Sequence, residues 1–575
     1  MLFSKTQIAD VFQAIADLLE IKGEVIFKIL AYRKAAESIE VLGRNIYDLQ
    51  AAGQLDQIPG VGKAIGEKID ELLTTGKLGF FERLQQEVPL SLRDLLQVPD
   101  LGPKKAALFW RQLGITDLTG LEAAAKDGKL SQLPGMGEKS TAKILAGIAA
   151  LHRRSGRISI GIAWPAAQEL IEFLRHQPGV VAVSTAGSLR RMRATIGDLD
   201  LVAAANDPHP VMDAFTHHPN VQHVISQGEA KSSIELEEGL RAQLWVQPPE
   251  RYGTALQFAT GSKDHNVRLR ELAISKGYSL SEQRLTRSDG SEILCATEEE
   301  VYRQLGLPYI PPELREDRGE IQAALAGKLP DLISMDDMQA DLHSHTSWSD
   351  GQATILEMAQ AALKAGLKVI AISDHSGGLG ITGGPTADCL PLHRQEIQDV
   401  QHKLGDKIKI LQGTEVEIKA DGTLDYPDEV LASLDIVIAS LHTSLRQPRE
   451  QITQRLLGVI QNPNVDIIGH PTGGLRPNRE GADLDIEAVL KAAAQYGVVM
   501  EINSDPARLD LDDINARRAV ESGVNLSINR DAHSPENIGR LEYGVATARR
   551  GWVTADKVIN TWGYERLVKW LHSRG

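Results

Sequence analysis

The sequence predicts a multidomain protein with an all-α N-terminal part, an α+β middle part and a C-terminal α/β barrel. Three observations predict this order. An apolar-Pro-x-x-Gly turn occurs three times before residue 140. Two aspartates stand two residues apart near residue 200, in a segment of strand-like composition. Beyond residue 339, short apolar runs alternate with helix-length segments, which is typical of parallel strands with crossover helices.

Length and composition limit the possible classes of protein. The chain has 575 residues, too many for one hydrophobic core, and roughly three to five domains are expected. No apolar run approaches the roughly 20 residues that span a bilayer, and the N-terminus lacks the pattern of a signal peptide. Cys295 and Cys389 are the two cysteines, which excludes a disulfide framework and favours a reducing, cytoplasmic compartment.

The net charge of −15 is unevenly distributed along the chain. Residues 1–155 carry 20 basic and 19 acidic side chains, whereas the remainder carries 42 and 58. A nearly neutral part with local lysine clusters can hold DNA beside an acidic part. The overall charge therefore does not exclude a nucleic-acid partner.

The repeated turn has the same order in each copy: Ile58-Pro-Gly-Val-Gly62, Val98-Pro-Asp-Leu-Gly102 and Leu133-Pro-Gly-Met-Gly137. Glycine permits a tight turn, so that N–H groups at the start of the next helix point toward a phosphate. This helix-hairpin-helix pattern binds the DNA backbone without reading sequence, although plain helix-connecting turns are the alternative, and the second copy departs by carrying Asp100. The expected DNA-binding residues are Gly60, Gly62, Lys63, Gly102, Lys104, Lys105, Gly135, Gly137 and Lys139.

The segment around the first turn has a second possible role. Residues 7–21 and 26–41 have helical apolar spacing. The segment Pro59-Gly-Val-Gly-Lys-Ala-Ile-Gly-Glu-Lys68-Ile-Asp-Glu resembles the N-terminal lyase domain of family X DNA polymerases. The resemblance implies that Lys68 forms the Schiff base that removes a 5′-deoxyribose phosphate, and an ordinary exposed helix lysine is the alternative. A nucleophilic lysine needs desolvation or neighbouring cations.

The paired aspartates, Asp198 and Asp200, lie on one face of a predicted strand and suit Mg²⁺ ions that bridge a triphosphate. A Gly-Ser turn and two arginines come ten residues earlier. Together they resemble the nucleotidyltransferase palm of family X polymerases, and a later Thr-Gly-Ser…Asn segment resembles the family's contact with the nucleotide. The resemblance implies catalytic Asp198 and Asp200 with Mg²⁺ or Mn²⁺, and a nucleotide held by Gly187, Ser188, Arg191, Thr260, Gly261, Ser262 and Asn266.

The third palm carboxylate of that family is missing here. In the family it lies on a later strand, in a Val-Asp-Leu-Arg segment before a proline. When the segments are aligned on Arg241 and that proline, the aspartate is replaced by Gln243 and the arginine by Trp245. A neutral amide is a poor Mg²⁺ ligand. We therefore expect a palm that keeps its fold but has weak or lost polymerisation, unless Glu235 or Glu237 substitutes.

Histidines and carboxylates follow successive apolar runs in the C-terminal part. In His343-Ser-His345 both imidazoles point the same way when the chain is extended. The carboxyl ends of parallel barrel strands meet at one end of the barrel, so donors placed there should converge. Scattered core histidines are the alternative. The nine expected ligands are His343, His345, Asp350, His375, Glu415, His442, His470, Asp531 and His533.

In this order the nine donors resemble the metal site of the polymerase-and-histidinol-phosphatase (PHP) domain, over about 235 residues. The resemblance implies three divalent ions, of Mn²⁺, Zn²⁺ or Fe²⁺ type, and hydrolysis of a phosphoester. Segments around Asp425 and Asn503 also match. Gly474 departs from an arginine frequent in relatives, and Arg476 could replace it.

The whole order resembles bacterial family X DNA polymerases fused to a PHP domain. The expected domains are a lyase-like domain (1–85), a fingers-like domain (86–155), a palm (156–249), a thumb (250–315), a linker (316–338) and a distorted (β/α)7 PHP barrel (339–575).

The resemblance implies a DNA repair enzyme, a metal-dependent 3′→5′ exonuclease that could also cleave abasic sites. Its expected partners are gapped or primer-template DNA with a 5′-phosphate and a deoxynucleoside triphosphate at the palm, with no membrane, and the chain is expected to be a monomer. Two alternatives remain open: a competent gap-filling polymerase with a proofreading nuclease, and a DNA-binding scaffold with structural metals. A small-molecule phosphatase would leave the three hairpins without a purpose.

Overall fold

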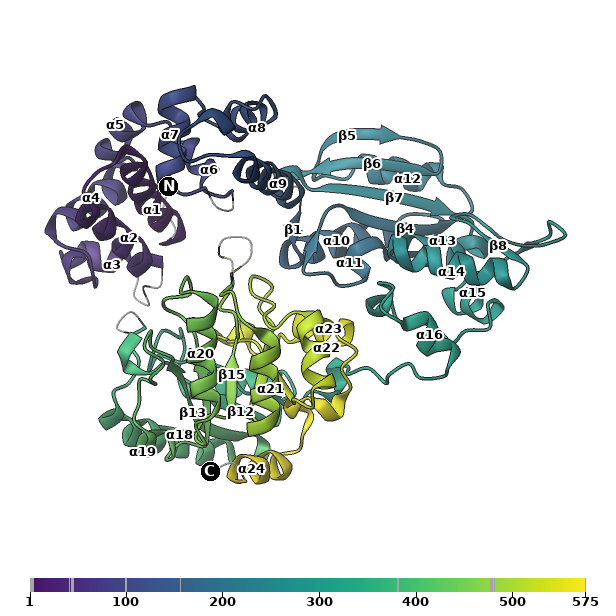
Figure 1. Ribbon diagram of the computed structural model, residues 1–575. Coiled ribbons are helices and arrows are strands. Elements are labelled where there is room, and N and C mark those ends of the chain that lie inside the picture. Colours follow the sequence, from purple (N-terminus) through teal and green to yellow (C-terminus); the bar gives the residue numbers. More distant parts are fainter. Residues whose placement is uncertain are drawn as a thin grey trace. The chain divides into compact units, whose positions relative to one another are not determined.

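The computed structural model describes residues 5–40, 42, 46–98, 101–155, 157–379, 382–475, 479 and 481–573 (Figure 1). The chain forms two compact units. One consists of Met1–Gly156 with Leu379–Gly384, and the other of Arg157–Gly378 with Pro385–Gly575. No helix among the described residues is both long and apolar enough to cross a membrane.

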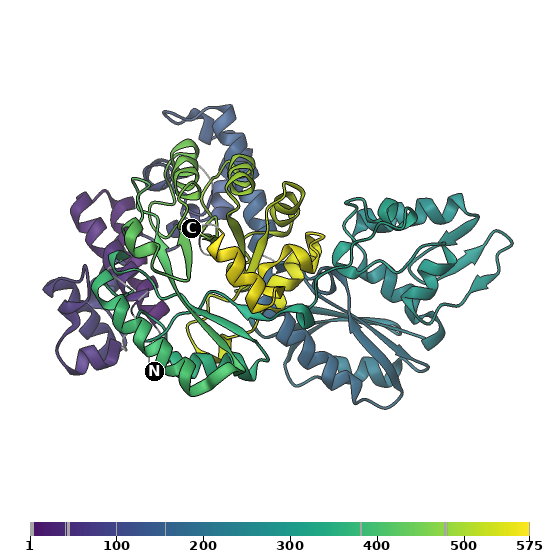
Figure 2. The ribbon, with the colours of Figure 1, turned by 90° about the horizontal axis from the view of Figure 1, so that it is seen from below.

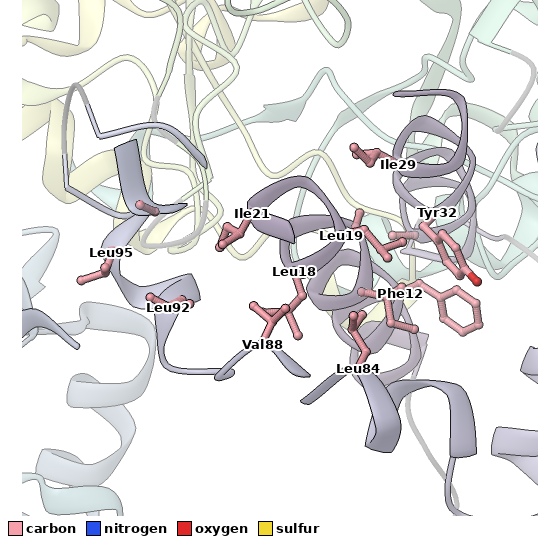
Figure 3. Packing of buried hydrophobic residues seen from close by; sticks show 14 of the residues in the cluster. Phe12, Leu18, Leu19, Ile21, Ile29, Tyr32, Leu84, Val88, Leu92 and Leu95 are labelled. Carbon is pink, nitrogen blue, oxygen red and sulfur yellow. The ribbon is translucent and has the colours of Figure 1, made fainter. Parts of the chain in front are cut away.

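The first unit is all-helical, as predicted. Its helices bury one continuous apolar core, part of which Figure 3 shows around Phe12, Leu19 and Tyr32. Ile8, Phe12 and Ile15 follow the helical spacing and are fully buried. Both predicted helices are present, and position 41, the expected end of the second, lies outside the described residues. The helices are α1 Lys5–Lys22, α2 Ile26–Glu40, α3 Ile46–Ala51, α4 Lys63–Thr75, α5 Gly79–Glu87, α6 Leu92–Leu95, α7 Pro103–Leu113, α8 Leu118–Lys126 and α9 Glu138–Ser155.

The second unit begins with a five-stranded sheet of order β2-β4-β7-β6-β5, the predicted palm, in which β4 and β7 are parallel and the other neighbours antiparallel. Helices α10 and α12 bury one face of the sheet, and α13 packs against Val202 on the other face. A short pair, β1 with β3, lies beside α10. The elements are β1 Ile158–Ser159, α10 Ile160–Arg175, β2 Val180–Thr185, α11 Gly187–Arg190, β3 Thr195–Ile196, β4 Leu199–Ala205, α12 His209–Thr216, β5 Val221–Gln227, β6 Lys231–Leu236, β7 Arg241–Gln247 and α13 Tyr252–Thr260.

A smaller helical and three-stranded part follows, the predicted thumb. Its core includes the fully buried guanidinium of Arg315, which is paired with Glu298 at 2.5 Å and lies over the rings of Tyr302 and Tyr309. A buried pair of this kind needs such close contacts, because the charges have lost their hydration. The elements are α14 Lys263–Ser275, β8 Tyr278–Leu280, β9 Leu285–Arg287, β10 Glu292–Ile293 and α15 Glu298–Gln304.

The connector after the thumb differs from the helical, loosely charged segment that the sequence suggests. Only α16, Glu320–Leu325, is α-helical within residues 316–337. Two of its acidic residues are buried in specific pairs: Glu316 lies 3.0 Å from both Arg191 and Arg550, and Glu320 lies 2.6 Å from His265. These partners come from distant parts of the sequence and fix the connector.

The last part is the predicted barrel. Its seven strands are parallel and run in sequence order, and a bridge between Ser344 and Ala532 joins the first strand region to the last. Figure 2 shows the green and yellow helices around these strands. The strands are β11 Ala340–Asp341, β12 Val369–Ile372, β13 Lys409–Glu417, β14 Ile436–Ser440, β15 Ile467–Gly469, β16 Val499–Asn503 and β17 Leu526–Asn529. The helices are α17 Ile355–Lys364, α18 Leu390–Leu404, α19 Asp428–Leu431, α20 Arg449–Ile460, α21 Ile486–Tyr496, α22 Asp513–Glu521, α23 Glu542–Arg550 and α24 Tyr564–His572.

The strands are apolar toward one end and polar toward the other. Leu411, Ile438 and Val499 pack with Trp562 and Leu567 from the C-terminal segment. Further along the same strands, on positions of the same parity, polar side chains replace the apolar ones. The barrel therefore has a closed apolar end and a polar end at the strands' carboxyl termini.

Candidate metal centre and palm site

The nine expected ligand residues meet at the polar end of the barrel. Eight of them form three groups, in each of which one donor atom per residue lies within 4.8 Å of the others. The ninth, His470, lies against the shared carboxylate of Glu415. The groups are His343, His345, Glu415 and Asp531; His345, Asp350, His375 and His533; and His375, Glu415 and His442.

Glu415 is the central carboxylate of the cluster. Its Oε2 lies 3.1 Å from His375 Nδ1 and 3.3 Å from His343 Nε2. Its Oε1 lies 2.9 Å from His470 Nε2 and 3.2 Å from His442 Nε2. One carboxylate thus faces imidazoles with both oxygens, an arrangement that suits a ligand shared between neighbouring ions.

Two further aspartates complete the groups. Asp531 Oδ1 lies 3.0 Å from His345 Nε2. Asp350 lies 3.3 Å from His533 Nε2 and 3.8 Å from His375 Nε2. His345 therefore faces different groups with its two ring nitrogens, because its Nδ1 lies 3.9 Å from Asp350.

Carboxylates behind the cluster orient the imidazoles. Glu501 lies 2.8 Å from His343 Nδ1, and Glu417 lies 2.7 Å from His442 Nδ1, so that the Nε2 atoms face the cluster. The sequence interpretation did not single out Glu417. It stands two residues after Glu415 on the same strand, and this spacing places both side chains on one side.

The donor set fits divalent ions. Within the described chain, several of its buried atoms make no hydrogen bond, which is costly unless another partner binds them. Imidazole nitrogen and carboxylate oxygen together suit Mn²⁺, Zn²⁺ or Fe²⁺. The identity and the number of the ions stay predictions. The unpartnered atoms are His343 Nε2, His345 Nδ1 and Nε2, His375 Nδ1, Glu415 Oε2, His470 Nδ1 and Asp531 Oδ1.

The electrostatics of the cluster are dominated by burial and by the carboxylates. Burial opposes the charged form of His442, but Glu415 and Glu417 outweigh it and raise the pKa of His442 to about 9. Burial lowers the pKa of His375 to about 3. The carboxyl pKa of Asp531 is held well below its ordinary value, against its burial, chiefly by His343. The site thus collects more negative charge than its histidines neutralise, which favours cations.

Removing the ions is expected to destabilise the barrel. Ligands that bind the folded state at about 1,000 times their Kd add about 4 kcal/mol, and the corresponding loss lowers the melting temperature by about 10 °C for a domain of this size. Differential scanning calorimetry before and after dialysis against EDTA measures this shift. His343→Ala is the control, because its transition should respond much less to EDTA. Equal melting of wild-type protein with and without EDTA would contradict the expectation.

The palm aspartates lie on the face of the sheet opposite α10 and α12. Asp200 on β4 pairs in parallel register with Gln243 on β7, so the amide stands where the missing carboxylate is expected. Burial, followed by the neighbouring charge of Asp198, raises the pKa of Asp200 to about 6. A Cβ at Gly187 would stand 2.0 Å from Asp200 Oδ2, so only glycine fits the turn beside this carboxylate.

The rest of this face offers no obvious replacement carboxylate among the described residues. Ser233 is the cross-strand neighbour of Gln243, while Glu235 pairs with Arg241, one step farther along the strand. Lys231 lies over the ring of Trp245, 4.6 Å from its centroid, and its charge lowers the pKa of Asp200. The face therefore combines two carboxylates with an amide and a cation.

The predicted nucleotide-binding residues are held by internal contacts. Arg191 donates to the carbonyl of Thr260 at 2.8 Å and pairs with Glu316 at 3.0 Å. Ser262 caps α14 through the N–H of His265, and Asn266 donates to the carbonyl of Phe258. Gly261 packs on the Asn266 side chain, and Ser188 is half-buried beside Gly187. Their nucleotide contacts stay predictions.

The hairpins have the backbone that the glycines predict. Gly60 and Gly135 have φ values of +79° and +75°, a region that favours glycine. Gly62 and Gly102 are the N-caps of α4 and α7, while Gly137 directly precedes α9. Pro99 and Asp100 lie outside the described residues. Of the predicted lysines, Lys63, Lys104 and Lys139 are exposed and Lys105 is half-buried.

Lys68 lies on α4 and is half-buried. Its ammonium donates to the carbonyl of Ala64 at 3.0 Å and lies 5.5 Å from the centroid of the Phe80 ring. Lys28 lies 5.7 Å from the same centroid, so a second cation shares this ring. A neighbouring cation is one of the two conditions for a nucleophilic lysine.

Family models match four segments of the chain. Residues 4–78 match a helix-hairpin-helix domain, and residues 92–150 match a SAM-like helix-hairpin-helix tandem. Residues 255–316 match a DNA polymerase beta thumb, and residues 341–505 match a PHP domain. These matches and the seven-stranded barrel confirm the predicted fold class.

Curated relatives match either the whole chain or its last part. A DNA polymerase/3′-5′ exonuclease PolX from Bacillus subtilis is 38% identical over 561 residues, which cover 97% of each chain. A "Probable phosphatase" from Thermoanaerobacter sp. is 36% identical over 232 residues, 38% of this chain and 89% of the relative. Another from Shewanella oneidensis is 30% identical over 230 residues, 38% of this chain and 86% of the relative.

Proposed function

Because this chain belongs to the bacterial family X DNA polymerases that carry a C-terminal PHP domain, we propose that its metal centre removes nucleotides from the 3′ ends of gapped DNA. The chain is an enzyme of the DNA polymerase/3′-5′ exonuclease type, with a PHP domain as its nuclease. The observation that carries the specific proposal is the cluster of three ligand groups around Glu415.

The residues of the cluster have distinct tasks in this proposal. Bound divalent ions would supply an acidified water and a charge that stabilises the leaving oxygen. Glu501 and Glu417 hold His343 and His442 with their Nε2 atoms toward the cluster. Glu415 faces several imidazoles at once and sets the spacing of the groups.

The N-terminal hairpins would present the DNA, with its 5′-phosphate end, to the enzyme. Their exposed lysines and outward N–H groups suit contacts with phosphates, which carry no base specificity. A small-molecule phosphatase, the activity suggested by the names of the shorter relatives, has no use for them. The proposed partner is therefore DNA with a gap or a primer-template end, bound by a monomer in the cytoplasm.

Alanine at Lys63 or Lys139 is expected to weaken DNA binding equally for unrelated sequences. Removing one lysine–phosphate interaction should reduce the slope of log K against log salt by about 1. Fluorescence anisotropy with a labelled gapped duplex at several salt concentrations measures the slope. Lys126→Ala is the matched control, because this exposed lysine pairs with Glu122 on α8 at 2.7 Å. Unchanged slopes in both hairpin variants would refute the proposed role of these lysines.

We further propose that the palm keeps nucleotide binding, with Mg²⁺ or Mn²⁺ at Asp198 and Asp200, while polymerisation is lost or weak. The amide of Gln243 beside Asp200 supports this proposal. A second candidate function, gap filling with proofreading by the PHP domain, is favoured by the two retained aspartates. Excision of a 5′-deoxyribose phosphate by Lys68 and cleavage at abasic sites complete the proposed activities.

One experiment tests these functions side by side. A single gapped duplex, labelled at the primer 5′ end, is incubated with Mn²⁺ or Mg²⁺ and with or without nucleotides. The proposal expects shortening of the primer and little extension. Extension that exceeds shortening under all conditions would favour the second candidate.

A further inference from the structure

The loop that joins β16 to α22, residues 504–512, touches the metal centre on one side. Asn503 Nδ2, at the end of β16, donates to Asp531 Oδ2 at 3.2 Å. Arg508 Nε, from the loop, lies 3.5 Å from the same oxygen. The other oxygen of Asp531 faces His345. Asn503 and Arg508 therefore fix the orientation of a carboxylate that belongs to the ligand cluster.

The same loop touches the palm on its other side. Ser159 Oγ donates to the carbonyl of Pro506 at 3.0 Å. A Cβ at Gly161, in the first turn of α10, would stand 2.7 Å from Cγ of Pro506. The backbone of the palm helix therefore lies directly against the proline ring, with no room for a methyl group.

Leu509 anchors the loop in the palm. It is 2% exposed and belongs to the hydrophobic cluster of the palm sheet, which includes Ile160 and Ile196. Its φ is +43°, a region that non-glycine residues rarely adopt. Such a conformation persists when surrounding contacts determine it. The palm supplies those contacts, next to the residue whose guanidinium reaches Asp531.

A charged network holds the end of the loop. Arg550 on α23 donates to the carbonyl of Arg191 at 2.7 Å and to Asp513, the first residue of α22, at 2.9 Å. It also lies 3.0 Å from Glu316, which pairs with Arg191. Palm and barrel are therefore joined both within the loop and at its exit, across a contact with little freedom.

We propose that the palm is a positioning element of the nuclease: Gly161 and the palm cluster around Leu509 hold the 504–512 loop so that Arg508 and Asn503 orient Asp531. Pro506 and Leu509 are positioning residues, since they act through their neighbours. This proposal rests on the proposed nuclease function of the metal centre. It gives the palm a task in 3′-end degradation that does not need polymerisation.

Gly161→Ala tests the proposal with one methyl group. Alanine favours the helical conformation of α10, so the palm itself is not weakened. The methyl group must displace the Pro506 ring, and a misplacement of about 1 Å near a reacting group costs about 100-fold in rate. A shift of a few tenths of an ångström is expected to reduce kcat for 3′-end degradation about tenfold. KM for the gapped duplex and the bound metal content should stay unchanged.

Two further variants separate positioning from general damage. Pro506→Ala in the Gly161→Ala background removes the ring and makes room for the methyl group, and it is expected to return kcat toward the value of Pro506→Ala alone. Leu509→Ala removes the palm anchor without any collision and should also lower kcat. Gly458→Ala is the matched control, because a Cβ at this helix position meets nothing within 4 Å.

The outcomes distinguish this proposal from the one beneath it. The positioning proposal is overturned if Gly161→Ala leaves kcat unchanged, if it alters KM alone, or if Pro506→Ala fails to relieve its defect. Wild-type protein and His343→Ala are assayed in parallel on the same duplex. If these two degrade DNA equally, the proposed nuclease itself fails, whatever Gly161→Ala does.

Discussion

Replacing His343 with alanine is expected to reduce 3′-end degradation by more than about 100-fold, the upper range for losing a mere outer partner of a metal ligand. His343 Nε2 lies 3.3 Å from Glu415 and 3.6 Å from Asp531, inside one ligand group. Its loss removes a donor and leaves Glu501 buried without its 2.8 Å partner. The measurement is the single-turnover rate on a gapped duplex with saturating Mn²⁺.

The control for His343→Ala is His402→Ala, which alters an exposed histidine in the last turn of α18. Binding of the gapped duplex by His343→Ala should remain close to that of wild-type protein, because the hairpin lysines are unchanged. Degradation that persists in His343→Ala would refute the assigned centre. Loss of degradation with binding retained would exclude a scaffold with purely structural metals.

Replacing Gln243 with aspartate is expected to increase primer extension by about 100-fold or more, the magnitude of one contact that stabilises charge in a transition state. The Asp200–Gln243 register places the new carboxylate beside an existing one, and a third carboxylate completes a two-metal arrangement. The measurement is the rate of single-nucleotide insertion into a gap, made in the His343→Ala background so that degradation does not obscure it.

Two variants control the Gln243→Asp experiment. Gln247→Asp adds the same charge on the same strand, but opposite Ala204, and should leave extension unchanged. Asp200→Ala combined with Gln243→Asp should abolish the gain. Vigorous extension by wild-type protein that Gln243→Ala destroys would instead show that the amide serves the polymerase.

The metal ligands could be predicted from sequence because each follows an apolar run that becomes a barrel strand. The direction of parallel strands then brings together residues as far apart as His343 and Asp531. The palm was accessible for a similar reason, since alignment on Arg241 places Gln243 where the structure pairs it with Asp200. In both cases a regular element carries the residue, and its geometry is known in advance.

Contacts between irregular segments could not be predicted in this way. Nothing in the local sequence shows that Glu316 pairs with Arg191, or that Pro506 lies on Gly161 more than 300 residues away. The connector was expected to be helical because its composition favours a helix, but tertiary pairing of its carboxylates decided the conformation. Such pairings depend on how complete domains pack.

The hydrophobic seat of Leu509 has a consequence for anyone who separates the nuclease from the rest of the chain. Cut out at residue 339, the barrel would expose this leucine to water and forfeit about 2 kcal/mol of burial. An isolated fragment would thus carry a sticky spot beside its own catalytic chamber. Freestanding phosphatases of this lineage must have solved that problem with a different residue, and grafting their solution here would yield a soluble excised enzyme.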